Sequence, residues 1–224
     1  NEKNSLNIVD IIQKEEYLVL NEDTKEIVFK TGSWSIENEI IIPEGYLLKI
    51  LQGTELTFFN EAYILSYSPI NFTGSLNSPI IIKSSTNSLG KGISVVNASD
   101  HSSMKYVNIF NMTNLNEIGF QFTGSVNFYN SNVTVENCNF FNNQSEDALN
   151  IVSSEFMIDN ASFNNCSSDA LDLDFCDGEI INTSFQSSVN DAIDCSGSQI
   201  IIKDIDIHSA GDKGISVGEN SNLY

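Results

Sequence analysis

The sequence predicts an all-β protein folded as a parallel β-helix, a solenoid whose coils are about 22 residues long. Two observations predict this fold. A strand-like element recurs four times at a fixed spacing, and a second column of apolar residues follows the same period. One short strand cannot bury its apolar face alone, so a strand that recurs at fixed spacing indicates coils stacked on one another.

The first repeated element is five residues long. Its second position is Ala or Gly, its third and fifth positions are apolar, and its fourth is Asn, Asp, Asp and Ser in turn. Such alternation is typical of a strand with one buried face. The four copies are residues 147–151, 169–173, 191–195 and 213–217. They predict two buried columns: Leu149, Leu171, Ile193 and Ile215 in one, and Ile151, Leu173, Cys195 and Val217 in the other.

The second column consists of Phe163, Phe185 and Ile207, which are 22 residues apart, with Phe140 preceding them by 23. A row of amides and one acid keeps nearly the same period at the bends: Asn137, Asn160, Asn182 and Asp204. Stacked Asn side chains can hydrogen-bond along such a row. Leucine-rich repeats share the period, but their Leu-x-x-Leu-x-Leu motif is absent, as is the Gly-Gly-x-Gly-x-Asp run of calcium-binding nonapeptide repeats.

The coils before residue 125 are less regular. Further strands are expected at 40–43, 47–51, 53–58 and 79–82, and copies of the repeated element at 92–95 and 119–122. Residues 1–25 lack the pattern and are predicted to form a short N-terminal cap, with Leu6, Val9 and Ile12 on its apolar side, before a solenoid that spans 26–224. The last strand is followed by seven residues, so the C-terminal end is expected to be open to pairing with another subunit.

The charge of the chain limits its partners. Thirty acids face ten lysines, arginine is absent, and the net charge is −20. Nucleic acid is therefore excluded as a partner, because phosphate binding needs clustered cations. The sequence holds no run of 18 apolar residues, so no membrane span is predicted. The four cysteines share no column at the 22-residue period and are predicted to be free thiols.

The candidate site is a column of acids expected to face outward. Asp147, Asp169 and Asp191 stack, with Lys213 at the end of the row, and Asp172 and Asp194 stack three residues further on. Two carboxylates one coil apart repel by about 3 kcal/mol at an effective dielectric of 20. Ca²⁺, which prefers carboxylate oxygens, would offset that repulsion. Solvated turn acids, screened by salt, are the alternative. The expected metal ligands are Asp147, Asp169, Asp172, Asp191 and Asp194.

Residues 190–198 and 211–219 resemble bacterial right-handed parallel β-helix proteins of the pectate-lyase-like superfamily. The resemblance implies a right-handed helix. Polygalacturonases of this superfamily carry Gly-His-Gly, but Gly211-Asp212-Lys213-Gly214 lacks the His and the chain lacks their Arg. Residues 163–173 are similar to the calcium-binding coil of pectate lyases, which implies Asp147, Asp169 and Asp172 as ligands and Lys203 or Lys213 as the base. Acidic surroundings would raise the pKa of such a Lys, which counts against lyase activity.

These observations predict an extracellular or cell-surface β-helix that acts as a scaffold or glycan-binding module, stabilised by calcium and without catalysis. One alternative is a calcium-dependent polysaccharide (uronate) lyase that uses Lys213 or Lys203. The other is a subunit of a stacked extracellular filament, which self-associates through the open C-terminal coil.

Overall fold

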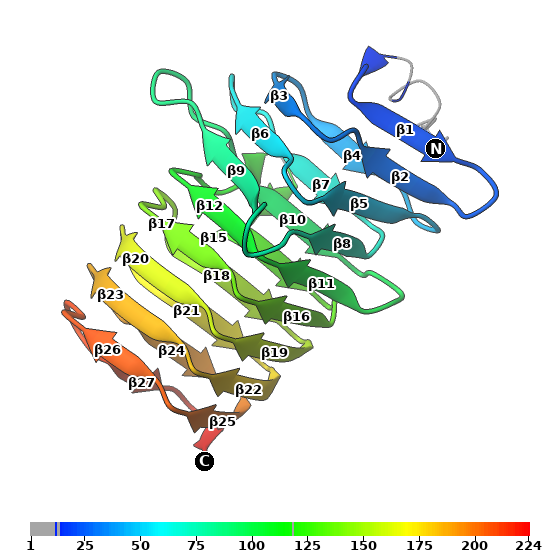
Figure 1. Cartoon of the computed structure of the whole chain (residues 1–224). Coiled ribbons are helices and arrows are strands. Elements are labelled where there is room, and N and C mark those ends of the chain that lie inside the picture. Colours follow the sequence, from blue (N-terminus) through cyan, green and yellow to red (C-terminus); the bar gives the residue numbers. More distant parts are fainter. Residues whose placement is uncertain (1–11, 13, 118) are drawn as a thin grey trace.

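The structure is a computed structural model that describes residues 12, 14–117 and 119–224, and it confirms the parallel β-helix. The described residues form one ten-stranded sheet (sheet A), two eight-stranded sheets (sheets B and C) and one two-stranded hairpin. Along most of the chain, each coil gives one strand in turn to sheets C, A and B. The coils stack along a single axis, from the N-terminal coils in blue to the C-terminal coils in red (Figure 1).

The strands of the three sheets have the following bounds. Sheet A contains β1 (Leu18–Asn21), β2 (Glu26–Phe29), β5 (Leu47–Leu51), β8 (Ile70–Thr73), β11 (Ser102–Lys105), β16 (Val133–Glu136), β19 (Glu155–Asp159), β22 (Asp177–Ile181), β25 (Gln199–Lys203) and β28 (Asn222–Leu223). Sheet B contains β3 (Ser33–Ile36), β6 (Glu55–Phe58), β9 (Ile80–Ser84), β12 (Val107–Phe110), β17 (Asn139–Phe141), β20 (Ser162–Cys166), β23 (Ser184–Ser188) and β26 (Asp206–His208). Sheet C contains β4 (Ile40–Ile42), β7 (Ile64–Ser66), β10 (Ile93–Val96), β15 (Gly124–Tyr129), β18 (Asp147–Val152), β21 (Asp169–Asp174), β24 (Ile193–Ser196) and β27 (Ile215–Val217).

The predicted register of the core is confirmed. Leu149 pairs with Leu171, Leu171 with Ile193 and Ile193 with Ile215, in parallel strands of sheet C. The second column follows the same pairing, although Val217, on the edge strand β27, is 49% exposed. On sheet B the rings of Phe140, Phe163 and Phe185 stack, with centroids 4.7 and 5.0 Å apart. The four cysteines are buried free thiols, as predicted.

The bends explain the row of asparagines. Asn137, Asn160, Asn182 and Asp204 have φ angles between 50° and 55°, the left-handed region that Asn and Asp enter more readily than other side chains. Asn160 Nδ2 donates to Asn137 Oδ1 at 2.5 Å, so the predicted amide ladder forms between these coils. Asn182 Nδ2 donates instead to Asp159 Oδ1 at 3.0 Å.

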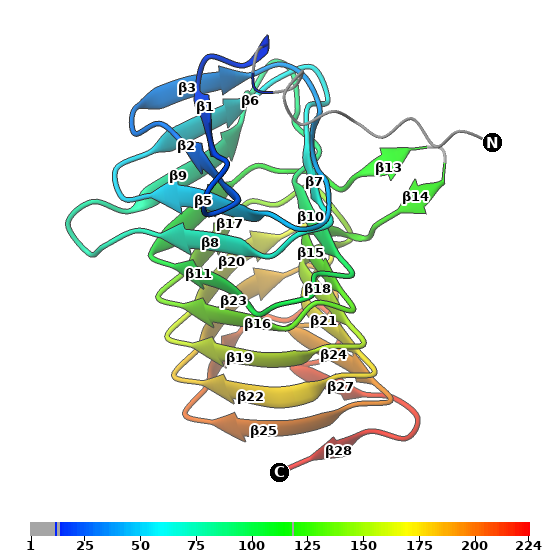
Figure 2. The same ribbon diagram turned by 90° about the vertical axis from the view of Figure 1, so that its right-hand side faces the viewer.

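One predicted strand is wrong. Residues 119–122 were expected to carry a copy of the repeated element, but β14 (Phe120–Gln121) pairs antiparallel with β13 (Asn116–Glu117) in the hairpin. The copy lies in β15 instead, where Val126 pairs with Leu149. Ser125 occupies the position that holds Ala or Gly elsewhere, and this substitution hid the element. The hairpin projects from the side of the solenoid (Figure 2), and Leu115 and Phe122, which flank it, pack against Leu65 of sheet C.

The two ends of the solenoid differ. β1 pairs antiparallel with β2, whereas β2 continues in parallel with β5. Of the expected apolar cap residues, Ile12 packs against the core, and Leu6 and Val9 lie outside the described residues. At the other end β26, β27 and β28 are the edge strands of the three sheets. Within the described part of the chain, no helix has the length and apolarity needed to cross a membrane.

Candidate functional site

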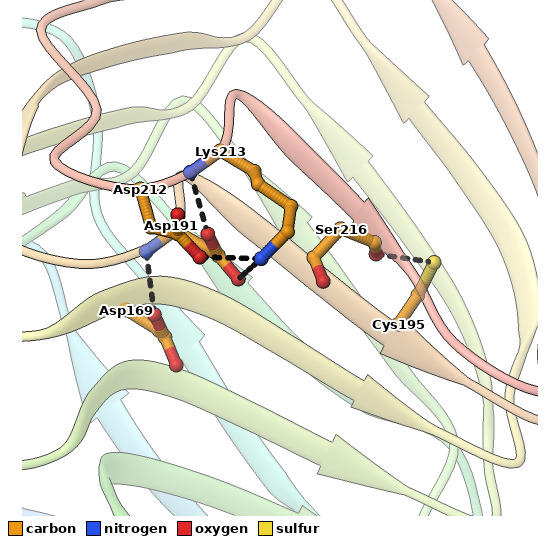
Figure 3. Close-up of polar contacts among 6 residues, drawn as sticks. All are labelled: Asp169, Asp191, Cys195, Asp212, Lys213 and Ser216. Atoms are coloured by element: carbon orange, nitrogen blue, oxygen red, sulfur yellow. Dashed lines mark hydrogen bonds and ion pairs between the residues drawn. The ribbon is translucent and has the colours of Figure 1, made fainter.

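The acid column lies at the start of the strands of sheet C, but it does not face outward as expected. Asp147, Asp169 and Asp191 are 1%, 8% and 3% exposed. Asp169 Oδ1 accepts the backbone N–H of Asp191 at 2.7 Å, and Asp191 Oδ1 accepts that of Lys213 at 2.7 Å (Figure 3). Asp169 and Asp191 thus each hold the backbone of the next coil. The expectation of an outward column was wrong because Asp169 and Asp191 accept backbone amides and Asp147 accepts from Asn150, all within the stack of coils.

The lysine at the end of the row lies where the sequence places it. Lys213 Nζ forms an ion pair with Asp191 Oδ2 at 3.9 Å and a shorter one with Asp212 (Figure 3). The hydrogen bond to Asp212 raises the pKa of Lys213. The other candidate base, Lys203, ends β25 on sheet A, and its Nζ lies 3.6 Å from Glu179. Lys213 therefore lacks the lowered pKa that a proton-abstracting base needs at neutral pH, and Lys203 lies on a different sheet from the acid column.

A second group of polar side chains lies further along the same strands and joins two coils. Asn150 Nδ2 donates to Asp172 Oδ2 at 2.6 Å and to Asp147 Oδ2 at 3.2 Å. Asn150 is only 2% exposed, and its Oδ1 has no hydrogen-bond partner among the described residues. We call Asp147, Asn150 and Asp172 the acid–amide cluster. One amide therefore bridges two carboxylates, and its own oxygen is left unsatisfied.

The acid–amide cluster is electrostatically strained. Burial, together with the charges of Asp169 and Glu146, raises the pKa of Asp147 to about 7. Burial also raises the pKa of Asp172 to about 8, and the charges of Asp147, Asp174 and Asp194 add to this effect. Desolvation and like charges both disfavour an ionised carboxylate. The cluster therefore favours a bound proton or a cation that compensates the negative charge.

Two more residues border the cluster. Asp194 of β24 pairs in register with Asp172, so Asn150, Asp172 and Asp194 occupy equivalent positions on successive coils. Tyr129 lies on the other side, with its ring edge-on to Phe122 at 4.9 Å between centroids. Burial raises the pKa of Tyr129, and the charges of Asp147, Asp172 and Asp174 contribute. An aromatic ring thus flanks the acidic part of sheet C.

The five expected ligands separate into two groups. Asp169 and Asp191 hold backbone amides, whereas Asp147, Asp172 and Asp194 lie at or beside the acid–amide cluster. Among the described residues, no three His, Cys, Asp or Glu side chains converge as a metal site would require. A cation there would use two carboxylates and the amide of Asn150. Sequence reasoning treated Asn150 only as a polar strand position, although its amide in an acid column was a visible signal.

Comparisons with known proteins do not assign the chain to a family. No protein-family model matches the chain, and no curated protein sequence matches it. The fold and register define it as a parallel β-solenoid of about eight turns. Among solved structures, it is similar to ORF18 of Geobacillus virus E2, with 12% sequence identity and a TM-score of 0.23. That match covers 96% of this chain, which spans 58% of the viral chain.

Proposed function

We propose that the chain is an extracellular or cell-surface β-helix module that binds glycans and is stabilised by calcium. The observation that carries the calcium part is the acid–amide cluster: two carboxylates are bridged by one amide whose oxygen lacks a partner. Rotating the Asn150 side-chain amide by 180° would exchange the two donated hydrogen bonds for an oxygen beside both carboxylates, a change that hardly alters the shape of the side chain. Three oxygens of that kind suit Ca²⁺, with water completing its shell.

The finer classification is also part of this proposal. We place the chain with right-handed helices of the pectate-lyase-like superfamily, on the resemblance of residues 190–198 and 211–219. Its role is binding rather than lyase chemistry, because Lys213 and Lys203 are both paired with acids. The net charge of −20 keeps such a module soluble and disfavours polyanionic partners.

Thermal unfolding of the full chain tests the calcium part. A ligand that binds only the native state stabilises it by about 2.7 kcal/mol at 100 times its dissociation constant. Calcium should therefore raise the melting temperature in a concentration-dependent way above neutral pH. Asp172→Asn should melt higher than the parent in EDTA, because it removes a repelling charge, and should lose most of the calcium-dependent rise.

The matched control is Asp177→Asn, which removes the same charge at an exposed position on β22 outside the cluster. This variant should keep the full rise with calcium. If the parent melts at the same temperature in EDTA and in millimolar calcium, the calcium part of the proposal is wrong. Equal losses in the Asp177→Asn and Asp172→Asn variants would assign the effect to general charge screening instead.

A further inference from the structure

A surface cavity of about 430 Å³ lies where three coils pass from sheet C to sheet A, away from the acid–amide cluster. Its size falls in the range typical of small-molecule sites, roughly 300–1,000 Å³. The residues that line it are Thr24, Lys25, Gly45, Tyr46, Leu47, Pro69, Asn71, Ser99, Asp100 and His101. They come from four separate stretches of the chain, which the solenoid brings together.

The lengths of successive turns explain why the chain is hollowed there. The turn between β7 and β8 is short, residues 67–69, and ends in the buried Pro69. The turns on either side are longer: residues 43–46 lie between β4 and β5, and residues 97–101 between β10 and β11. A short turn between two longer ones leaves a notch in the stack. The notch is therefore a consequence of backbone lengths and not of one mobile side chain.

The turn that carries the aromatic side of the cavity is well anchored. The backbone N–H of Tyr46 donates to Ser68 Oγ at 3.0 Å, and that hydroxyl donates to Pro43 O at 2.6 Å. Gly45, with φ of 88°, lets the chain turn just before Tyr46. Lys25 Nζ lies over the Tyr46 ring, 5.7 Å from its centroid. The turn is thus fixed by hydrogen bonds and the Tyr46 side chain packs partly against the core, which lowers the entropic cost of binding.

The opposite side of the cavity is polar. Asp100 and Ser99 are exposed, and Ser99 Oγ donates to Asp100 Oδ2 at 3.2 Å. Asn71 Oδ1 accepts from Thr73 Oγ1 at 2.5 Å, and Asn71 faces the cavity from β8. His101 Nε2 lies 2.8 Å from Thr134 Oγ1. Carboxylate, hydroxyl and amide groups therefore line the same cavity as Tyr46, Leu47 and Pro69.

We propose that this cavity binds a neutral saccharide, with a sugar ring packed on Tyr46 and its hydroxyls hydrogen-bonded to Asp100, Ser99 and Asn71. A sugar has an apolar C–H face and a polar rim, and the cavity offers both surfaces in that arrangement. A neutral sugar fits better than an acidic one. Lys25 is already paired with Glu22 at 2.8 Å, Asp100 is an acid, and the whole chain carries −20. This inference rests on the proposed glycan-binding role and names its site.

The test is calorimetric titration of the full chain with cellohexaose, maltohexaose and mannohexaose, and with hexagalacturonate as the acidic comparison. We expect at least one neutral probe to bind and hexagalacturonate to bind at least tenfold more weakly. Tyr46→Ala should weaken binding of the neutral probe at least tenfold, whereas Tyr46→Phe, which keeps the ring, should stay within about twofold. Asp100→Ala, at an exposed loop position, should weaken it several-fold without changing the melting temperature.

Tyr224→Ala is the matched control, because Tyr224 is 72% exposed and lies beyond β28, at the other end of the solenoid. It should bind like the parent. Lack of binding by all three neutral probes, or unchanged affinity in both Tyr46→Ala and Asp100→Ala, would overturn the proposal. Tighter binding of hexagalacturonate would overturn the choice of a neutral ligand.

Repeating the titration in EDTA separates this inference from the calcium proposal. The cavity shares no residue with the acid–amide cluster, so saccharide affinity should be the same with and without calcium. A chain that binds the saccharide but shows no calcium-dependent melting would retain this inference and lose the calcium proposal. The reverse result would retain calcium and remove the saccharide site.

Discussion

The acid–amide cluster should make the stability of the metal-free protein fall as the pH rises. The pKa of Asp147 lies at about 7 in the folded chain, against an ordinary value of 3.8. The folded state therefore holds a proton that the unfolded state has lost. The contribution of Asp147 to the unfolding free energy is fully present below about pH 4 and is lost progressively as the pH rises to about 7.

The magnitude follows from the size of the shift. The pKa of Asp147 rises from 3.8 to about 7, and a pKa difference of one corresponds to about 1.36 kcal/mol. Asp147 alone therefore changes the unfolding free energy by about 4 kcal/mol at most. The pKa of Asp172, at about 8, extends the fall to higher pH. The two contributions do not add fully, because the charge of Asp147 is one cause of the shift at Asp172.

Urea unfolding in EDTA, followed by circular dichroism between about pH 5 and about pH 9, measures this effect. The parent should lose unfolding free energy across that range, and Asp147→Asn should lose much less. Asp177→Asn, which removes one exposed acid, should keep the parental slope and so account for the general effect of net charge. A parental slope that Asp147→Asn leaves unchanged would refute the electrostatic account of the cluster.

Three further predictions concern the core, a serine in a turn and the lysine at the end of the acid column. Leu171→Asp buries an unpaired charge at a fully buried position and should cost more than about 4 kcal/mol, so circular dichroism should show that the C-terminal coils unfold. The control Gln186→Asp, at an exposed position, should leave them folded. If Leu171→Asp melts like the parent, the register is wrong. Ser198→Ala leaves the Cys176 N–H, 2.9 Å from Ser198 Oγ, without its acceptor and should cost about 1–3 kcal/mol in urea unfolding; a cost near zero would contradict this role. Lys213→Ala should lower the melting temperature slightly. The parent should release no ultraviolet-absorbing product from polygalacturonate or alginate with calcium, and turnover lost in a folded Lys213→Ala variant would favour the lyase.

The regular part of the fold was predictable because its period is uninterrupted. From β18 to β27 the coils keep a 22-residue spacing, so alternation alone placed Leu149, Leu171, Ile193 and Ile215 in one column. The coil before them was not predictable in the same way. Inserted residues separate Ile93 from Val126, its partner in the next coil, and Ser125 replaces the expected small apolar residue. Residues 119–122 have the same short pattern of glycine, apolar, polar and apolar residues, so they were predicted to be the strand that β15 forms in the structure.

A further column was present in the sequence but was not recognised. A small residue recurs every 22 or 23 residues, each time one residue after a bend: Ser131, Ser154, Cys176, Ser198 and Ser221. Ser154 Oγ accepts the N–H of Ser131, and Ser198 Oγ accepts that of Cys176. These side chains satisfy backbone amides inside the turn. Because a thiol also fits this position, the column explains why a lone buried Cys176 occurs among serines.

The burial of the acid column could not be predicted, because it depends on which acceptor each backbone amide finds. The N–H of Asp191 donates to the carboxylate of Asp169, but the N–H of Asp169 donates to the backbone carbonyl of Glu146 at 2.8 Å. The carboxylate of Asp147 is therefore not needed by the next coil and turns its Oδ2 to Asn150. Three acids in one register thus have two different roles. Of the three, Asp147 alone belongs to the acid–amide cluster, because its carboxylate is not the acceptor for a backbone amide of the next coil.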